Sequence, residues 1–329
     1  MAAGKFNMQK ASGGVASITV ADGVGATNIV LPESGTVATT SNIVGFKNYI
    51  INGGFDIWQY PSYVAVDDYR LDRWVISGTS NISLMFKGDL TGEAPSACGL
   101  YFTKNGAGSS FFSQRIETPR RLSGKTVTVT FWIYSTQTMD GSVYFDKYNP
   151  TDGFTAGVTT GKTFNWTNGW NKVTHTTTIP TLNSNHNAVG SYLQLTISVT
   201  GTSAGAWLAA VQLEEGSVAT PFEQRPYGLE LSLCQRYYQV YGDSTQGINI
   251  IGYSIAGQTE RASFMFPIQM RDNPNATRVG TWYAGNCSQP TIAAKSKNGF
   301  SLQTIVAATG GFEYTCNGTG QYLIFEKEL

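Results

Sequence analysis

The stretch that decides the fold runs from Ala206 to Tyr238 and reads AWLAAVQLEEGSVATPFEQRPYGLELSLCQRYY. Its first part predicts a strand, because apolar residues recur at alternate positions and would share one face. These residues are Trp207, Ala209, Val211 and Leu213. Breaks at Gly216 and Pro221 end that strand.

The second part of the stretch predicts a helix over Leu229–Gln239. Its apolar residues form two stripes, Leu229/Leu233/Tyr237 and Leu231/Cys234/Tyr238. A helix this short is marginal alone, and with two apolar sides it is expected between packed bodies. The whole stretch therefore predicts the last strand of one β-domain, a linker and a helical junction to the next domain.

Composition indicates an all-β protein with many tight turns. The chain has 37 glycines and 12% aromatic residues, a composition typical of strands and turns. Basic and acidic residues number 22 each, so the formal net charge is zero. Nucleic acids and anionic membranes attract an excess of Lys and Arg, so neither is expected as a partner. No apolar run approaches the ~20 residues of a membrane helix, and residues 1–10 do not resemble a signal peptide.

Residues 1–45 form a segment that differs from the rest. The runs Ala16–Ala21 and Asn28–Leu31 are β-like but too small to bury a core of their own. They need a partner, either other copies of the chain or another protein. The alternative is a flexible tail.

Residues 46–227 predict a β-sandwich or jelly roll, since about eight to ten short strands alternate with turns. The strongest strand is Thr126–Ser135, and Ser142–Tyr148 and Tyr192–Val199 show the same alternation. The residues expected to face the core on these strands are Val127, Val129, Phe131, Ile133, Val143, Phe145, Leu193, Leu195, Ile197 and Val199. A linking helix is expected at 228–239 and a second, smaller β-domain at 240–329.

Several stretches resemble bacteriophage tail fibre proteins. The stretch 206–238 resembles the domain junction of such fibres, and three others agree with it in order: NYIINGGFDIWQ (48–59), FSQRIETPRRLSGKTVTVTFWIYS (112–135) and FPIQMRDNPNATRVG (266–280). The resemblance covers roughly residues 20–329. It implies a virion fibre, usually homotrimeric, that recognises a host surface polysaccharide such as lipopolysaccharide. It also implies docking to other tail proteins through residues 1–45, and assembly in the host cytoplasm.

Residues 46–227 also resemble jelly-roll carbohydrate-binding modules, through NGGFD (52–56), GWNKVTHTTTIP (169–180) and AVQLEEG (210–216). Many such modules hold a structural calcium ion between an acid after the first Gly-Gly-Phe and an Asp on the last strand. Asp56 matches the first position, but Ala209 or Ala210 stands at the second. Calcium also prefers six to eight oxygen ligands, a set the sequence does not supply.

Residues for catalysis or for a metal site are sparse. The two histidines, His175 and His186, form no Ser/His/Asp arrangement, and His175 is expected to be exposed on a strand. The four cysteines are far apart, so no metal site is predicted and free, mostly buried thiols are expected. Carboxylates that could serve a glycosidase are expected to be solvated instead. They are Asp67, Asp68, Asp72, Glu214 and Glu215.

The best candidate for a ligand site follows from the strand phases. If the apolar residues face the core, the opposite faces are expected to share one sheet surface rich in aromatic and polar side chains. The predicted glycan-binding residues are Trp132, Tyr134, Tyr144, Asp146, Tyr192 and Gln194, with Tyr148 beside them. Aromatic faces stack on the C–H faces of sugars, and amide and carboxylate groups bind hydroxyls. A subunit interface is an equal alternative, because Tyr and Trp also favour protein contacts.

Three functions remain open at this point. The first is a passive, homotrimeric receptor-binding fibre, with Trp282, Tyr283 and Asn286 as candidate contacts at a distal tip. The second is a tail-associated hydrolase or deacetylase acting on surface polysaccharide. The third is a free carbohydrate-binding module that does not depend on its first 45 residues.

Overall fold

The structure is a computed structural model. It describes residues 7–10, 16–20, 27–30, 47–60, 68–78, 82–90, 94–106, 108–242, 247–316, 318 and 320–328. The chain divides into two compact units, Met1–Lys47 and Asn48–Leu329. Among the described residues, no helix combines the length and the apolar character needed to cross a bilayer.

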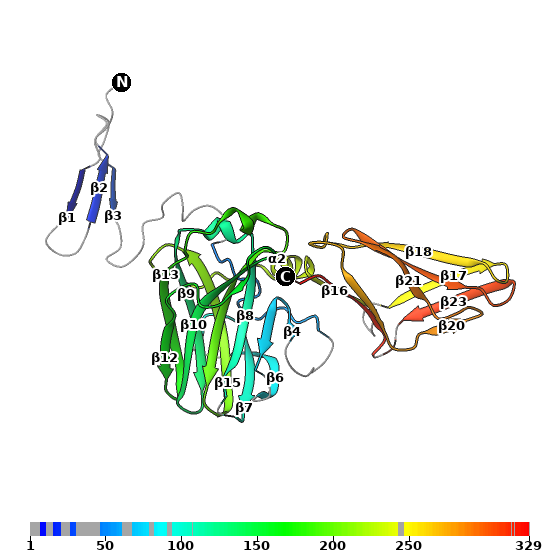
Figure 1. Cartoon of the computed structure of the whole chain (residues 1–329), viewed down its shortest axis with the longest axis horizontal. Helices are drawn as coiled ribbons and strands as arrows, with labels where there is room; N and C mark the ends of the chain where they lie inside the picture. Colours follow the sequence, from blue (N-terminus) through cyan, green and yellow to red (C-terminus); the bar gives the residue numbers. More distant parts are fainter. Residues whose placement is uncertain are drawn as a thin grey trace, which may run out of the picture. The chain divides into compact units, whose positions relative to one another are not determined.

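The first unit contains one antiparallel sheet, drawn in blue in Figure 1. It consists of β1 (Asn7–Lys10), β2 (Ala16–Val20) and β3 (Thr27–Val30), in that order. The sequence predicted β2 and β3 to within one residue at each end. It missed β1, because Asn-Met-Gln-Lys shows no apolar alternation. The docking role of this unit stays a prediction.

The second unit begins with a β-sandwich made of two antiparallel sheets (Figure 1). The seven-stranded sheet has the order β11-β10-β14-β8-β5-β4, and β12 pairs with β10. Its strands are β4 (Asp68–Leu71), β5 (Trp74–Ser77), β8 (Ser110–Glu117), β10 (Met139–Asn149), β11 (Gly153–Thr155), β12 (Lys162–Trp166) and β14 (Tyr192–Thr200). Two short 3-10 helices connect strands, η2 (Pro119–Leu122) and η3 (Ser184–Asn187).

The five-stranded sheet of the sandwich has the order β13-β9-β15-β7-β6. Its strands are β6 (Ile82–Asp89), β7 (Cys98–Lys104), β9 (Thr126–Ser135), β13 (Gly169–Thr178) and β15 (Ser203–Glu215). Side chains of both sheets meet in one hydrophobic core. The ten residues that the sequence placed in this core are all fully buried, which confirms the strand phases of β9, β10 and β14.

Strand β15 lies at the centre of the five-stranded sheet, between β9 and β7. Its pairing with β9 shifts between Ala209 and Gln212, and Ala210 has a positive φ of 51°. Such a bulge adds one residue and reverses which face the following side chains occupy. Trp207 therefore lies on the outer face, whereas Val211 lies in the core. The prediction that both share one face was wrong for this reason.

The segment NGGFD packs against the bulged part of β15. The Val211 amide donates to the Gly53 carbonyl at 2.9 Å, and a Cβ at position 53 would collide with the Val211 carbonyl. The Asn52 side chain is fully buried and bonds to both the amide and the carbonyl of Ile57. The predicted turn at 52–54 is thus held in place by close backbone approach to β15.

Helix α2 (Tyr227–Gln235) is shorter than the predicted Leu229–Gln239. Strand β16 (Tyr238–Gly242) already begins at Tyr238, so the predicted stripes are cut at their C-terminal ends. The helix is fixed through Glu230, which is buried and pairs with buried Arg225 at 3.1 Å. Arg225 also donates to the Ile50 carbonyl of the sandwich. A buried ion pair therefore joins the helix to the sandwich, while Cys234 is the apolar residue of the helix that is fully buried.

The chain ends in a smaller β-domain of three antiparallel sheets with a core of its own. The sheets have the orders β16-β24-β19, β17-β23-β20 and β18-β22-β21. Their strands after β16 are β17 (Ile248–Ser254), β18 (Thr259–Met265), β19 (Asn275–Val279), β20 (Tyr283–Gly285), β21 (Thr291–Ser296), β22 (Gly299–Ile305), β23 (Gly310–Cys316) and β24 (Tyr322–Glu326). The all-β fold class predicted from composition is confirmed.

Candidate functional site

The predicted ligand residues lie on two sheets and not on one. Trp132 and Tyr134 belong to β9 in the five-stranded sheet, whereas the other predicted residues belong to β10 and β14 in the seven-stranded sheet. Because the sheets pack through their inner faces, their outer faces point in opposite directions. The predicted single surface was therefore wrong. Alternation along a strand shows which side chains face outward, but not which sheet the strand joins.

An aromatic row crosses the outer face of the five-stranded sheet, with one residue from each strand. Residues directly opposite each other in register share a face, and the row follows that rule from β13 to β6. Its members are Trp170, Tyr134, Trp207, Tyr101 and Phe86. Ring centroids lie 5.6 Å apart for Trp170 and Tyr134, 5.0 Å for Trp207 and Tyr101, and 4.7 Å for Tyr101 and Phe86. All five side chains are half-buried, so part of each ring is accessible.

Glycines in the sheet make room for the central ring of this row. Gly88 of β6 and Gly99 of β7 are directly paired, and the Trp207 indole lies against both. A Cβ at Gly88 would collide with the far edge of that indole. The sequence therefore builds a flat aromatic surface by combining large rings on some strands with glycines on their neighbours.

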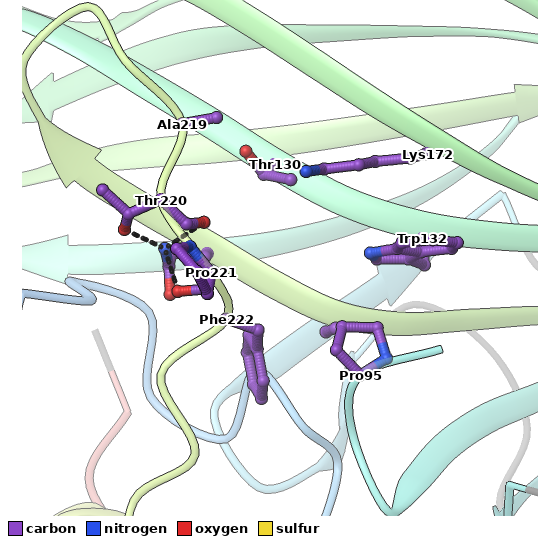
Figure 2. A pocket seen from close by; sticks show the side chains of 10 residues that line it. Pro95, Thr130, Trp132, Lys172, Ala219, Thr220, Pro221 and Phe222 are labelled. Atoms are coloured by element: carbon purple, nitrogen blue, oxygen red, sulfur yellow. Dashed lines mark hydrogen bonds between the residues drawn. The ribbon is translucent and has the colours of Figure 1, made fainter. Parts of the chain in front are cut away.

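A cavity of about 370 Å³ lies beside the aromatic row on the same face. Trp132 and Lys172, which are paired residues of β9 and β13, line it together with the segment that follows β15. Figure 2 shows the Trp132 indole between Lys172 and Pro95, with Pro221 and Phe222 across the cavity. The cavity thus joins aromatic rings to an ammonium group.

The wall of the cavity that follows β15 is held by buried polar side chains. Gln212 accepts a hydrogen bond from the Glu223 amide at 2.8 Å and donates to Glu214 at 2.9 Å. Glu214 in turn accepts from the Thr220 amide at 2.9 Å. These bonds fix residues 220–223 before any ligand binds, which lowers the entropy that binding costs.

The predicted polar residues on the seven-stranded sheet form hydrogen bonds within the protein. The Asp146 side chain is buried, and its carboxylate accepts from Thr196 at 2.9 Å and from the Gly157 amide at 2.8 Å. Gln194 donates to the same carboxylate at 3.3 Å. Burial, together with the Asp146 charge, raises the pKa of Tyr144. Asp146 therefore serves the sheet internally, and its use as a ligand group stays an untested prediction.

The three residues predicted to lie at a distal tip also differ in how accessible they are. Trp282 is buried in the core of the C-terminal domain and donates to the Val279 carbonyl at 3.3 Å, so it cannot be a surface contact. Asn286 holds its own loop, since its side chain donates to the Ala308 and Gly311 carbonyls at 2.8 Å. Tyr283 is 60% exposed and is the one of the three that is open to a partner.

Several predicted solvated groups are in fact buried. Asp72 and Glu214 lie in the interior, and His175 faces the core opposite Val129, so these three predictions were wrong. Glu215 is exposed as predicted; Asp67 and the side chain of Asp68 lie outside the described residues. Burial lowers the pKa of both histidines, and His186 bonds to Asn183 and Asn149. These contacts do not form a nucleophile–base pair.

The residues at the position of the calcium ion in the resembled modules do not fit a metal ion. The Lys87 ammonium donates to the Asp56 carbonyl at 2.8 Å, and the Asp56 carboxylate accepts from Gln224 at 2.7 Å. Ala209 and Ala210 are buried and add no side-chain oxygen. In the part of the chain that the structure describes, no group of three or more His, Cys, Asp and Glu side chains could hold a metal ion.

We expect that calcium and chelators leave the melting temperature unchanged, because Lys87 already supplies a positive charge beside Asp56. Thermal unfolding should be measured in excess EDTA and in excess calcium chloride. A ligand that binds only the folded state raises its stability by mass action, so a melting temperature that falls with EDTA and recovers with calcium would contradict the assignment.

Similarity between this chain and known proteins was found among solved structures. No protein-family model and no curated protein sequence matches the chain. Among solved structures, the enzymatically active domain of bacteriophage CBA120 tailspike protein 4 is 16% identical with a TM-score of 0.36, over 56% of this chain and 24% of that one. The chain thus spans about a quarter of that tailspike structure.

Two further similarities are to carbohydrate-binding proteins. Carbohydrate-binding modules of the β-sandwich superfamily give 17% identity and a TM-score of 0.35, over 64% of this chain and 74% of theirs. The N-terminal cellulose-binding domain of Cellulomonas fimi β-1,4-glucanase C gives 15% identity and a TM-score of 0.31, over 44% and 90%. At identities and TM-scores this low, the ligand or activity in each name is stated of that protein and is not transferred to this chain.

Proposed function

We propose that the chain is a bacteriophage tail fibre that attaches the virion to a glycan of the bacterial surface, without cleaving it. The glycan lies on the outer face of the five-stranded sheet, over the aromatic row and Trp132. The observation that carries this proposal is the row itself, because five aligned and accessible rings match the repeating C–H faces of a saccharide chain.

The cavity beside the row supplies the polar part of recognition. Lys172 lines it next to Trp132, and its ammonium group can donate to sugar oxygens. Thr220 lines the cavity as well, but its hydroxyl already donates to Glu214 at 2.6 Å. The bonds of Gln212 and Glu214 described above hold Thr220 in place. The proposed site therefore combines stacking with a few preset polar contacts.

The viral part of the proposal rests on the sequence resemblance to tail fibres. It includes a homotrimer, docking to other tail proteins through residues 1–45, and a place in the virion tail after assembly in the host cytoplasm. Exposed apolar side chains in the C-terminal domain support a contact between copies of the chain. Ile251 and Tyr253 on β17 are 71% and 77% exposed, which is costly for a surface that stays in water.

Replacing Trp132 and Tyr134 together by alanine should weaken glycan binding by at least about tenfold, because two stacking rings are lost. A panel of bacterial surface polysaccharides should first be screened with the full-length protein, and the best ligand then titrated by calorimetry. Tyr144→Ala on the opposite sheet is the matched control and should bind as the parent does.

Two further measurements separate a ligand site from a subunit interface. Both rings are half-buried, so the double variant should melt close to the parent, whereas a tryptophan lost from a core costs about 3–5 kcal/mol. Light scattering should give the mass of three chains for both proteins. Unchanged affinity in the double variant would end the site assignment, and a loss of mass would assign the face to subunit contact.

A further inference from the structure

A second groove lies at the opposite sheet, between the sandwich and the C-terminal segments of the chain. It consists of two adjoining cavities of about 320 and 400 Å³, which share Val189, Gly190, Arg271 and Asp272. The sandwich contributes the ends of β8 and β14 and the loop after η3. Lys327 and Glu328, which follow β24, close the other side.

Positive charge is in excess in this groove. Its cations are Arg115, Arg236, Arg271 and Lys327, and its carboxylates are Glu117, Asp272 and Glu328. Two of these carboxylates are already engaged, because Glu117 pairs with Arg236 and Arg271 and Glu328 pairs with Arg73. Lys327 takes part in none of the ion pairs found between described residues. The four cations of the groove therefore exceed its three carboxylates by one charge.

Glu117 is held between two of the arginines of the groove, Arg236 and Arg271. Burial by itself would raise the pKa of this carboxyl, yet Arg236 and Arg271 outweigh burial and hold the pKa below its ordinary value. The carboxylate therefore stays ionised and keeps both arginines in position. Both arginines line the same cavity as Glu117.

An aromatic wall faces these charges. Tyr148 and Tyr192 are paired residues of β10 and β14, and their rings stack at 5.1 Å with 20° between the planes. The Arg115 guanidinium lies 4.7 Å from the Tyr192 ring and donates to Gln194 at 3.2 Å. Tyr148 is half-buried and lines the groove. The sequence predicted Tyr192 as a glycan-binding residue. In the structure, its ring stacks against that of Tyr148 in the groove.

We propose that this groove binds an anionic saccharide, with Tyr148 against the sugar ring and Lys327, Arg236 and Arg271 around its acidic group. A planar arginine fork and a nearby ammonium group suit carboxylate or phosphate oxygens. A neutral sugar offers no acidic group to these cations and binds more weakly. The groove is on a different sheet from the aromatic row, so it does not depend on the function proposed for that row.

The test is calorimetric titration of the full-length protein with trigalacturonate and with the same trisaccharide after reduction of its carboxyl groups. Glucose 6-phosphate, beside glucose, forms a second arm that asks whether phosphate serves instead of carboxylate. We expect at least one anionic probe to bind more tightly than its neutral counterpart, and its affinity to fall as salt is added, because charge pairs at a surface are screened.

Variants locate the binding. Lys327→Gln should weaken the anionic probe by about fivefold, the value of one charge-assisted contact of about 1 kcal/mol. Lys172→Gln and Trp132→Ala, both at the other sheet, should leave it unchanged. The proposal is overturned if neither anionic probe exceeds its neutral counterpart, or if Lys327→Gln has no effect. It is also overturned if Trp132→Ala abolishes binding of the anion, since that would place the anion at the aromatic row.

Discussion

Replacing Arg73 by methionine should lower the free energy of unfolding by about 3–5 kcal/mol, because it leaves a buried carboxylate without its cation. Arg73 is 1% exposed and pairs with Glu328, which is 8% exposed. It also donates to the Arg115 carbonyl at 2.6 Å, and its guanidinium lies 3.5 Å from the centre of the Tyr237 ring. One side chain thus contacts β8, the turn between α2 and β16, and the segment after β24.

The charge of Glu328 explains why the loss is large. Burial raises the pKa of this carboxyl to about 7, against the opposing effect of Arg73. Without Arg73, the carboxylate must either stay charged in the interior or take up a proton at neutral pH, and both cost free energy.

The double variant Arg73→Met/Glu328→Gln is the matched test of this explanation. It removes both charges and should recover a substantial part of the lost stability. Exposed Arg120→Met should change stability by less than about 0.5 kcal/mol. Urea unfolding of the four proteins measures all of these effects. A single variant as stable as the parent would show that the buried pair contributes nothing.

Replacing Asp72 by asparagine should change how stability depends on pH. The Asp72 side chain is fully buried, and burial raises its pKa from 3.8 to about 6, although hydrogen bonds from Gln59 and the Arg73 charge oppose the shift. Glu328, Tyr60, Tyr238 and Cys234 are the other titratable groups coupled to this site. The native state therefore holds this proton more tightly than the unfolded chain does.

The sign of the effect follows from that difference. The stability that protonated Asp72 contributes is fully present below about pH 3.8 and is lost as the pH rises through about 6. The difference between the two pKa values corresponds to about 3 kcal/mol. Asparagine does not ionise, so the variant should gain about 2 kcal/mol relative to the parent between about pH 4 and pH 8.

Urea unfolding of both proteins across this range measures the effect. Exposed Asp140→Asn is the control and should follow the parent at every pH. The raised pKa of Glu328 makes the parent lose stability in the same direction, so only the difference between variant and parent isolates Asp72. A difference that stays constant with pH would contradict a shifted Asp72.

Strand phases could be predicted from the sequence because alternation is a local property. On β9, the apolar side chains from Val127 to Ile133 face the core as predicted, and Trp132 and Tyr134 lie outside. The same reasoning failed on β15, where one extra residue at Ala210 placed Trp207 and Val211 on opposite faces of the sheet. A bulge depends on the partner strand and on Gly53 packing against it, and neither is visible in the strand's own sequence.

Burial of polar groups was the second feature that could not be predicted from the sequence. Asp72, Glu214 and Glu230 carry charges that favour water, and only the partners that the fold brings to them make burial tolerable. Glu230 meets Arg225 five residues away, but Arg73 meets Glu328 across 255 positions of the sequence. Pairings of such long range leave no local pattern. The prediction for Trp282 was also wrong. Its place in a short aromatic loop predicted an exposed side chain, but the ring is buried in the core of the C-terminal domain.

The amino-acid sequence by itself determined an all-β chain, the core-facing side chains of its main strands and a break with a helix near residue 228. These follow from alternation, turn residues and short-range propensity, which act between neighbours in the chain. Only the tertiary structure decided which outward-facing rings stand together, because the order of strands in a sheet is set by contacts between distant segments. That order aligned Trp170, Tyr134, Trp207, Tyr101 and Phe86 in one row and sent Tyr144 and Tyr192 to the opposite face.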